Sequence, residues 1–414
     1  MRKQPSIFIQ YLLAFVIAVA FVTLIALRTN TMKPQSDGRE YIEMGRYGIF
    51  NNPNLIAPFA YRPGMPYLSA GMSALFGVDI KLGFRMAGWL SMVALLMGIY
   101  TLSREFISDH RKALLPMLIL GLSFYHIKFP LFFYSLVDVA AYPLIVFSFW
   151  AFIKKKYWLC LALTSVGVLF KEFLAIPMLL LMVQVGILYF KEKSGNNLFR
   201  FLLTVFVGGA AILLPRLLLP VSSTEQFVDP LNDLSTLTNL VTAPFDEMRV
   251  FNVFFALLSY WLPTWLLLTR SRGMKILDEL KQRGILLWCG AFLLLDLGLT
   301  FYGGTNIPIF ISYSVPIQAI VLALLVREGP GLVEYIFTFL VMLMYNKILF
   351  LIPDPTVDIE LFITYYGGWS NRVDPRTFVR LLDMGIFIAL AAVLRTAVPW
   401  ISAQFHRKPQ LPSS

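Results

Sequence analysis

Residues 7–27 of the chain read IFIQYLLAFVIAVAFVTLIAL, a run without a charged side chain that follows Arg2 and Lys3. A helix needs about 20 mostly apolar residues to cross roughly 30 Å of hydrocarbon, so this run predicts a membrane span. It is too long for the apolar region of a signal peptide, and no small-x-small cleavage pattern follows it. We therefore expect a retained first transmembrane helix.

The remainder of the chain continues this pattern. Of its 414 residues, 58% are apolar and 14% are charged, and the mean hydropathy is +0.70. A soluble domain of this length needs more charge to cover its surface. No repeat of fixed period and no soluble segment interrupts the apolar runs. The sequence predicts an all-α polytopic membrane protein, one domain over residues 1–414, with about twelve transmembrane helices and a range of ten to thirteen.

The expected spans are apolar runs bounded by charge or by Pro, Gly and Asn. They lie near residues 7–27, 84–103, 112–128, 133–153, 157–170, 173–190, 199–219, 250–269, 284–302, 309–327, 331–352 and 378–400.

The distribution of basic residues predicts the orientation. With a cytoplasmic N-terminus, every strongly basic short connection falls on the same side, as the positive-inside tendency requires. The C-terminus is then cytoplasmic too. The long loops 28–66, 220–249 and 353–377 fall on the opposite face, and we expect short juxtamembrane helices within them. Function in such proteins concentrates where irregular chain is retained, so the site is expected at the extracytoplasmic face of the cytoplasmic membrane.

Several site classes are disfavoured by composition and spacing. Cys160 and Cys289 both lie in apolar runs, which argues against a disulfide framework or a thiolate metal site. The net charge of +11 comes from short basic blocks between spans, so no nucleic-acid partner is expected. The three histidines lack metal-ligand spacing, and no Gly-rich phosphate loop or nucleophile elbow is present.

The first long loop carries acids beside the end of the first span. It reads SDGREY over residues 36–41 and ends with YRPGMPY over residues 61–67. Asp37 and Glu40 have the spacing of a capping box, and Tyr41 with Met44 and Tyr47 would form the apolar stripe of a surface helix. Asp37 is therefore either a helix cap or a functional acid.

The fourth expected span contains an acid. Tyr134, Asp138 and Tyr142 stand at i, i+4 and i+8, which places them on one helical face. A carboxylate at the centre of a bilayer helix costs about 2.5 kcal/mol or more, so Asp138 is a functional candidate. The alternative is a structural acid satisfied by a neighbouring Tyr or Arg.

Lys171 and Glu172 interrupt an apolar stretch and fall at the outer turn of an expected helical hairpin. They either mark the turn, with Lys171 reaching the head groups, or take part in function.

Basic residues also accumulate at the expected outer face, against the positive-inside trend. An anionic partner explains so many cations, because Arg binds phosphate bidentately, and anionic lipid head groups are the competing explanation. These residues are Arg62, Arg85, Lys128, Arg216, Arg249, Arg372, Arg376 and Arg380.

Together these motifs resemble the polytopic glycosyltransferases of the C-type fold (GT-C), which take sugars from polyprenyl-phosphate donors. The matching pieces are the acidic loop 36–41, the segment 61–66, Asp138 on an early span, and the break at Lys171 and Glu172. The resemblance covers roughly residues 30 to 190. The C-terminal half departs from it, because no soluble acceptor-binding domain is recognisable there, which leaves the acceptor open.

The resemblance implies that Asp37 is the catalytic acid residue, acting as general base on an acceptor hydroxyl or holding it in place. Cations on the lipid phosphate would stabilise the leaving group. The resemblance allows Asp138 and Glu172 to bind either sugar hydroxyls or a divalent cation such as Mg or Mn, and members of the family differ in metal use. The substrate-binding residues implied are Arg39, Glu40, Tyr61, Arg62, Asp138, Lys171, Glu172 and Arg372.

The function expected from the sequence is therefore transfer of a sugar from a polyprenyl-phosphate donor to a lipid or glycan acceptor of the cell envelope. A transporter or flippase of a lipid-linked or anionic substrate is the rival, since about twelve spans with charged residues also suit a carrier. An O-antigen-like polymerase or ligase is a third reading that shares the outer site.

Overall fold

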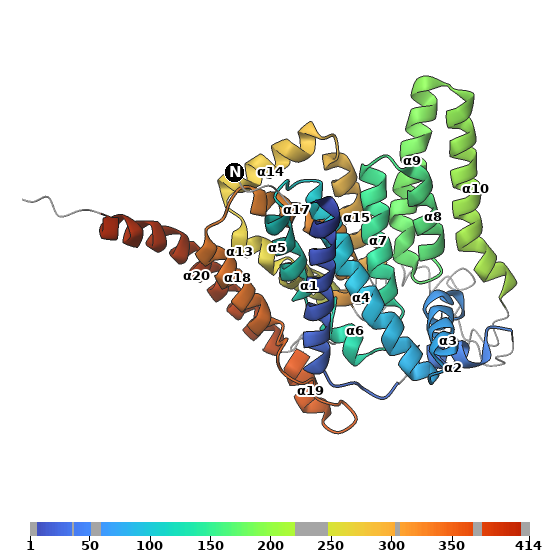
Figure 1. Cartoon of the computed structure of the whole chain (residues 1–414), viewed down its shortest axis with the longest axis horizontal. Coiled ribbons are helices and arrows are strands. Elements are labelled where there is room, and N and C mark those ends of the chain that lie inside the picture. Colours follow the sequence, from blue (N-terminus) through green and yellow to red (C-terminus); the bar gives the residue numbers. More distant parts are fainter. Residues whose placement is uncertain are drawn as a thin grey trace, which may run out of the picture.

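The computed structural model describes residues 6–34, 37–50, 59–219, 247–302, 307–366 and 375–406 (Figure 1). All regular secondary structure in these ranges is helical, which confirms the all-α prediction. The elements of the first half are α1 (Ile7–Leu27), α2 (Asp37–Tyr47), η1 (Phe59–Tyr61), α3 (Gly64–Phe76), α4 (Ile80–Arg104), α5 (His110–Gly121), α6 (Lys128–Phe132), α7 (Asp138–Ile153), α8 (Tyr157–Gly167), η2 (Glu172–Leu174), α9 (Ala175–Glu192) and α10 (Gly195–Leu218).

The second half is helical as well. Its elements are α12 (Glu247–Tyr260), α13 (Leu262–Leu267), α14 (Arg270–Gln282), α15 (Leu286–Tyr302), α16 (Ile307–Ile311), η4 (Ser312–Ser314), α17 (Val315–Arg327), α18 (Leu332–Tyr345), α19 (Ile359–Tyr366) and α20 (Pro375–His406).

Several of these helices are suited to a membrane. Five segments are long and apolar enough to cross one: α1, α4, η2 with α9, α10, and α16 with α17. Helices α14 and α15 form a pair bent by 106°, which brings the count to six if they make one span. Four apolar helices of 10–17 residues, α7, α8, α12 and α18, are shorter. The chain is a polytopic membrane protein by this measure, and the expected number of about twelve spans stays a prediction.

Helix α17 lies at the centre of the bundle. Helix α4 packs against most of the helices that precede α8. Helix α4 contacts α1, α3, α5, α7 and α17. Helix α17 is apolar around its whole circumference and almost entirely buried, as expected of a helix surrounded by other helices. Helices α1 and α10 are also apolar all round but bury little of their surface, which leaves them suited to contact lipid.

The bundle has two chemically different ends. Figure 1 shows α2, α3, α6 and α19 at one end, and α14 with the turn between α9 and α10 at the other. Ion pairs at the second end join Lys154 to Glu105 at 3.0 Å and Arg327 to Glu279 at 3.0 Å. The expected outer loops that are described therefore gather at one end, away from these basic connections.

Several expected spans differ from the structure: 112–128 ends at Gly121 in α5, and 331–352 ends at Tyr345 in α18. Two further differences have a clear local cause. Helix α7 begins at Asp138, so Asp138 and Tyr142 share a helical face as expected. Tyr134 lies in the turn before the helix and does not belong to that face. The chain turns there because Phe133 ends α6 with non-helical backbone angles. The run 250–269 is broken between α12 and α13, where Pro263 lacks the N–H needed to continue a helix.

The α3–α4 hairpin generates a stability prediction. A Cβ at Gly83 would overlap the backbone carbonyl oxygen of Ser69, which cannot rotate away. Gly83→Ala should therefore lower the unfolding free energy by about 1–3 kcal/mol, the usual cost of overpacking. Gly71→Ala on α3 is the control, because its Cβ would meet nothing within 4 Å. Thermal unfolding of both purified variants checks this, and equal midpoints would refute the packing assignment.

Candidate functional site

Helix α2 is fixed against the bundle by close backbone approach. A Cβ at Gly38 would overlap Ser135 Oγ, so α2 begins directly beside the turn that leads into α7. Gly45 similarly lies against the Pro66 carbonyl oxygen and the Phe84 ring. Asp37, the first residue of α2 and partly exposed, is thereby held near the start of α7.

Arg62 connects this helix to the turn between α8 and α9. Its Nε donates to Glu172 Oε1 at 2.8 Å, and Nη1 donates to the Tyr41 hydroxyl at 3.1 Å. The Arg62 side chain is only 14% exposed. Gly64 N–H also donates to the Leu169 carbonyl oxygen at 2.9 Å, which fixes the segment after Arg62 against the same turn. Two of the sequence motifs, far apart in the chain, therefore meet here.

Asp138 and Lys171 form a second, more deeply buried pair. Lys171 Nζ lies 3.1 Å from Asp138 Oδ1, and the two side chains are 8% and 10% exposed. The Tyr313 hydroxyl donates to the same oxygen at 2.7 Å. Tyr313 in turn stacks on Phe173. A neighbouring Tyr thus helps to satisfy Asp138, as the structural alternative expected, together with a cation.

The two pairs belong to one electrostatic cluster. Lys171 and Glu172 are adjacent in sequence, so each pair holds one residue of the same turn. Burial raises the pKa of Tyr41 well above its ordinary value, Arg62 opposes the rise, and Asp138 and Asp37 add to it. Tyr41 therefore stays a neutral hydroxyl that lies within electrostatic range of both acids.

A polar layer continues from this cluster through the core. Tyr142 and Ser312 join their hydroxyls at 2.6 Å. The Tyr260 hydroxyl lies 2.9 Å from His126 Nε2 and donates to the Ser312 carbonyl oxygen at 3.3 Å. Sequence reasoning missed Ser312, Tyr313 and Tyr260, although Ser-Tyr-Ser at 312–314 is a visible polar break between two apolar runs.

The other expected substrate-binding residues lie in different surroundings. Arg39 is 74% exposed and pairs with Glu43 at 3.1 Å, so it lies apart from the cluster. Glu40 keeps one buried carboxylate oxygen without a hydrogen bond, and burial raises its pKa, with Glu43 adding to the effect. Tyr61 lies under the Arg216 guanidinium at 5.3 Å. Arg372 lies outside the described residues.

Within the described parts of the chain, the acidic side chains do not gather into a set of metal ligands. Across the described ranges, no three His, Cys, Asp or Glu side chains gather as ligands. Asp138 and Glu172, the acids considered for a metal, are each compensated by a protein cation, Lys171 and Arg62 respectively. Asp138 and Glu172 are therefore already compensated without the divalent cation that the resemblance allowed.

Comparison with known proteins bears on the fold. No protein-family model and no curated protein matches the sequence. The structure is similar to a crystal structure of ArnT from Cupriavidus metallidurans bound to undecaprenyl phosphate, with a TM-score of 0.52 and 14% identity. The match covers 97% of this chain and 81% of that one. At such low identity the likeness concerns the fold, and it supports the expected C-type fold.

The buried pair can be tested by a double-mutant cycle. Lys171→Met leaves Asp138 with a neutral donor only, and removing one partner of a buried pair costs about 3–5 kcal/mol. Adding Asp138→Asn should recover part of that loss, which thermal unfolding of the four purified proteins measures. Lys275→Met is the control: Lys275 is 65% exposed in its pair with Glu328, so the cost should stay below about 1 kcal/mol. Strict additivity of the two core substitutions would contradict a direct pair.

Proposed function

We propose that the chain is a membrane glycosyltransferase that moves a sugar from a polyprenyl-phosphate donor to a lipid or glycan acceptor at the extracytoplasmic face. The observation that carries this proposal is the docking of α2, with Asp37 at its start, against the cluster of Arg62, Glu172, Lys171 and Asp138. The likeness to ArnT, whose structure is described as bound to undecaprenyl phosphate, supports a polyprenyl-linked partner.

Asp37 acts in this proposal as the general base on the acceptor hydroxyl, or holds that hydroxyl in place. Displacing a lipid phosphate from an anomeric carbon needs a proton acceptor and cations on the leaving group. The partly exposed position of Asp37 suits a group that must reach substrate. The electrostatic influence of Asp37 and Asp138 on Tyr41 supports their proximity.

Lys171 and Arg62 are proposed to bind the phosphate, with Arg372 as a third cation. Each already contacts a carboxylate, but an ammonium has three donor N–H groups and a guanidinium five. Both can therefore bond a phosphate oxygen while they remain paired. Arg39, Glu40, Tyr61, Asp138 and Glu172 are proposed to bind the sugar or the acceptor through hydrogen bonds to hydroxyl groups.

We further propose the membrane arrangement. The chain is one domain of about twelve spans in the cytoplasmic membrane, with both termini cytoplasmic. Loops 28–66, 220–249 and 353–377 face outward, and the first carries Asp37. The gathering of α2, α3 and α19 at one end supports this assignment (Figure 1).

Replacement of the proposed base tests the assignment directly. Asp37→Asn keeps the size of the side chain and removes its ability to accept a proton, so turnover should fall by about a hundredfold or more. Purified protein is incubated with radiolabelled polyprenyl-phosphate sugars, and the label that leaves the lipid is counted.

The matched control is Asp354→Asn, the same chemical change in another loop of the expected outer face. Asp354 Oδ1 accepts from Thr356 N–H at 2.8 Å, a bond that an asparagine oxygen can retain. Full activity in the control, with equal thermal stability in both variants, isolates the effect at Asp37. Undiminished turnover of Asp37→Asn would remove the central assignment.

The rival carrier function predicts a different result in the same system. In sealed vesicles a transporter would move the labelled lipid across the bilayer with its sugar still attached. Transport without bond cleavage would therefore favour the carrier, whereas label transferred to a second molecule favours the transferase.

A further inference from the structure

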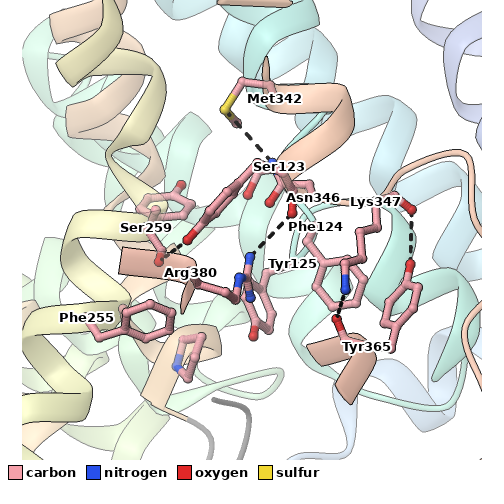
Figure 2. Close-up of a pocket in the computed structure, with 14 residues that line it drawn as sticks. Ser123, Phe124, Tyr125, Phe255, Ser259, Met342, Asn346, Lys347, Tyr365 and Arg380 are labelled. Carbon is pink, nitrogen blue, oxygen red and sulfur yellow. Dashed lines mark hydrogen bonds between the residues drawn. The ribbon is translucent and has the colours of Figure 1, made fainter. Parts of the chain in front are cut away.

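A pocket with several polar lining residues lies away from Asp37, between the α5–α6 turn, α12, the end of α18, α19 and α20. Figure 2 shows Lys347, Arg380, Tyr365 and Tyr125 around it, with Ser123 and Ser259. Most of these residues carry a hydrogen-bond donor or an aromatic ring. They come from distant parts of the sequence, and Ser123 and Arg380 are 257 positions apart. Long-range packing has therefore assembled a donor-rich pocket.

Lys347 lines the pocket, and Lys128 lies behind it against the lining residue Tyr365. Both lysines are held by neutral oxygen atoms. Lys347 Nζ donates to the Tyr365 carbonyl oxygen at 2.8 Å. Lys128 Nζ donates to the Tyr365 hydroxyl at 2.7 Å, and also to the carbonyl oxygens of Lys347 and Phe350. Among the described residues neither lysine lies within ion-pair distance of a carboxylate. Asp383 on α20 attracts Lys347 electrostatically from beyond that distance.

Arg380 is a third cation, and it also lines the pocket. Its guanidinium lies 4.3 Å from the Tyr345 ring centroid and 5.9 Å from that of Phe255. Its Nη2 also donates to the Tyr345 carbonyl oxygen at 3.4 Å. Stacking on aromatic faces holds a guanidinium plane in place, and its edge is the part that binds phosphate.

This pocket differs in charge from the cluster beside Asp37. There, Lys171 and Arg62 each meet a carboxylate at about ion-pair distance, so much of their charge is compensated. Here Lys128 and Lys347 meet carbonyl and hydroxyl oxygens, which solvate a cation without neutralising it. Two ammonium groups that converge on one tyrosine repel each other, and a bound anion would relieve that repulsion.

We propose that this pocket is a phosphate-binding site, with Lys347 and Arg380 as its main ligands and tyrosine and serine hydroxyls as further donors. The phosphate group belongs either to a lipid head group or to free inorganic phosphate, because both present the same anionic oxygen atoms. The inference rests on the proposed function only in making a polyprenyl phosphate the first lipid to test.

A series of polar contacts connects the pocket to the Asp138 cluster. Tyr260 lines the pocket, and its hydroxyl bonds His126 Nε2 and the Ser312 carbonyl oxygen. The next residue, Tyr313, donates to Asp138. A phosphate bound here therefore lies at one end of a continuous polar layer whose other end is the proposed reaction centre.

The test measures binding without turnover. Full-length protein in phosphatidylcholine nanodiscs is titrated with radiolabelled inorganic phosphate, with a polyprenyl monophosphate, and with the uncharged polyprenol. Lys347→Gln and Arg380→Gln should each weaken phosphate binding at this pocket about tenfold or more. The reason is that a hydrogen bond to a charged group contributes at least roughly 1.4 kcal/mol. Lys347→Arg keeps the charge and should retain most of the affinity.

The matched control is Lys81→Gln, which removes an exposed lysine at the start of α4 and should leave binding unchanged. Loss of affinity for inorganic phosphate in the variants supports a free-phosphate site, and loss for the polyprenyl phosphate alone supports a lipid head-group site. Equal binding of polyprenol and polyprenyl phosphate, or unchanged affinity in folded Lys347→Gln protein, overturns the proposal.

A further comparison separates this site from the transferase assignment. Asp37→Asn should bind phosphate like the wild type while losing sugar transfer. If neither pocket substitution changes phosphate affinity while sugar transfer still depends on Asp37, the phosphate-binding proposal is wrong. The proposed transferase function is then unaffected.

Discussion

The pairing of Lys171 with Asp138 is the constraint on which the arrangement of the site depends. A charge placed among apolar helices is costly unless a partner and further hydrogen bonds compensate it. Here the carboxylate receives the ammonium at 3.1 Å and the Tyr313 hydroxyl at 2.7 Å. Three segments, the start of α7, the α8–α9 turn and η4, are thereby fixed at one point.

Glu172, the residue after Lys171, connects this arrangement to the loop that carries Asp37. Glu172 receives Arg62, and Arg62 also donates to Tyr41 on α2. A short amphipathic helix such as α2 has little stability of its own in isolation. Its position therefore depends on this pairing and on the glycine contacts at positions 38 and 45. The acid at its start is held by the same interactions that satisfy the buried charges.

The protein contains two groups of basic side chains whose surroundings differ. Lys171 and Arg62 are paired with carboxylates, which makes them components of the scaffold as well as candidates for substrate contact. Lys128 and Lys347 are solvated by carbonyl and hydroxyl oxygens, an arrangement that preserves positive potential. The polar layer through Ser312 and Tyr260 joins the two regions across the core. In the proposed sugar transfer, Lys171 and Arg62 bind the lipid phosphate beside Asp37, and the proposed pocket at Lys347 is a separate phosphate site.

Features that depend on local composition could be predicted from the amino-acid sequence. Its apolar runs predicted an all-helical membrane protein, the pattern at 37–47 predicted a short helix, and the charges at 171 and 172 predicted the break between α8 and α9. Hydropathy and helical periodicity act over one or two turns, so these predictions were accessible. The start of α7 at Asp138, which separates Tyr134 from the face expected for it, was not among these predictions. The pairing of Arg62 with Glu172 could not be predicted, because it depends on how the helices pack. The same holds for the contacts of Asp138 with Lys171 and Tyr313, and for those of Lys128 and Lys347 with Tyr365. Three of these contacts, such as Arg62 with Glu172, join residues more than a hundred positions apart. Which residues meet depends on how whole helices pack, and no local pattern encodes this.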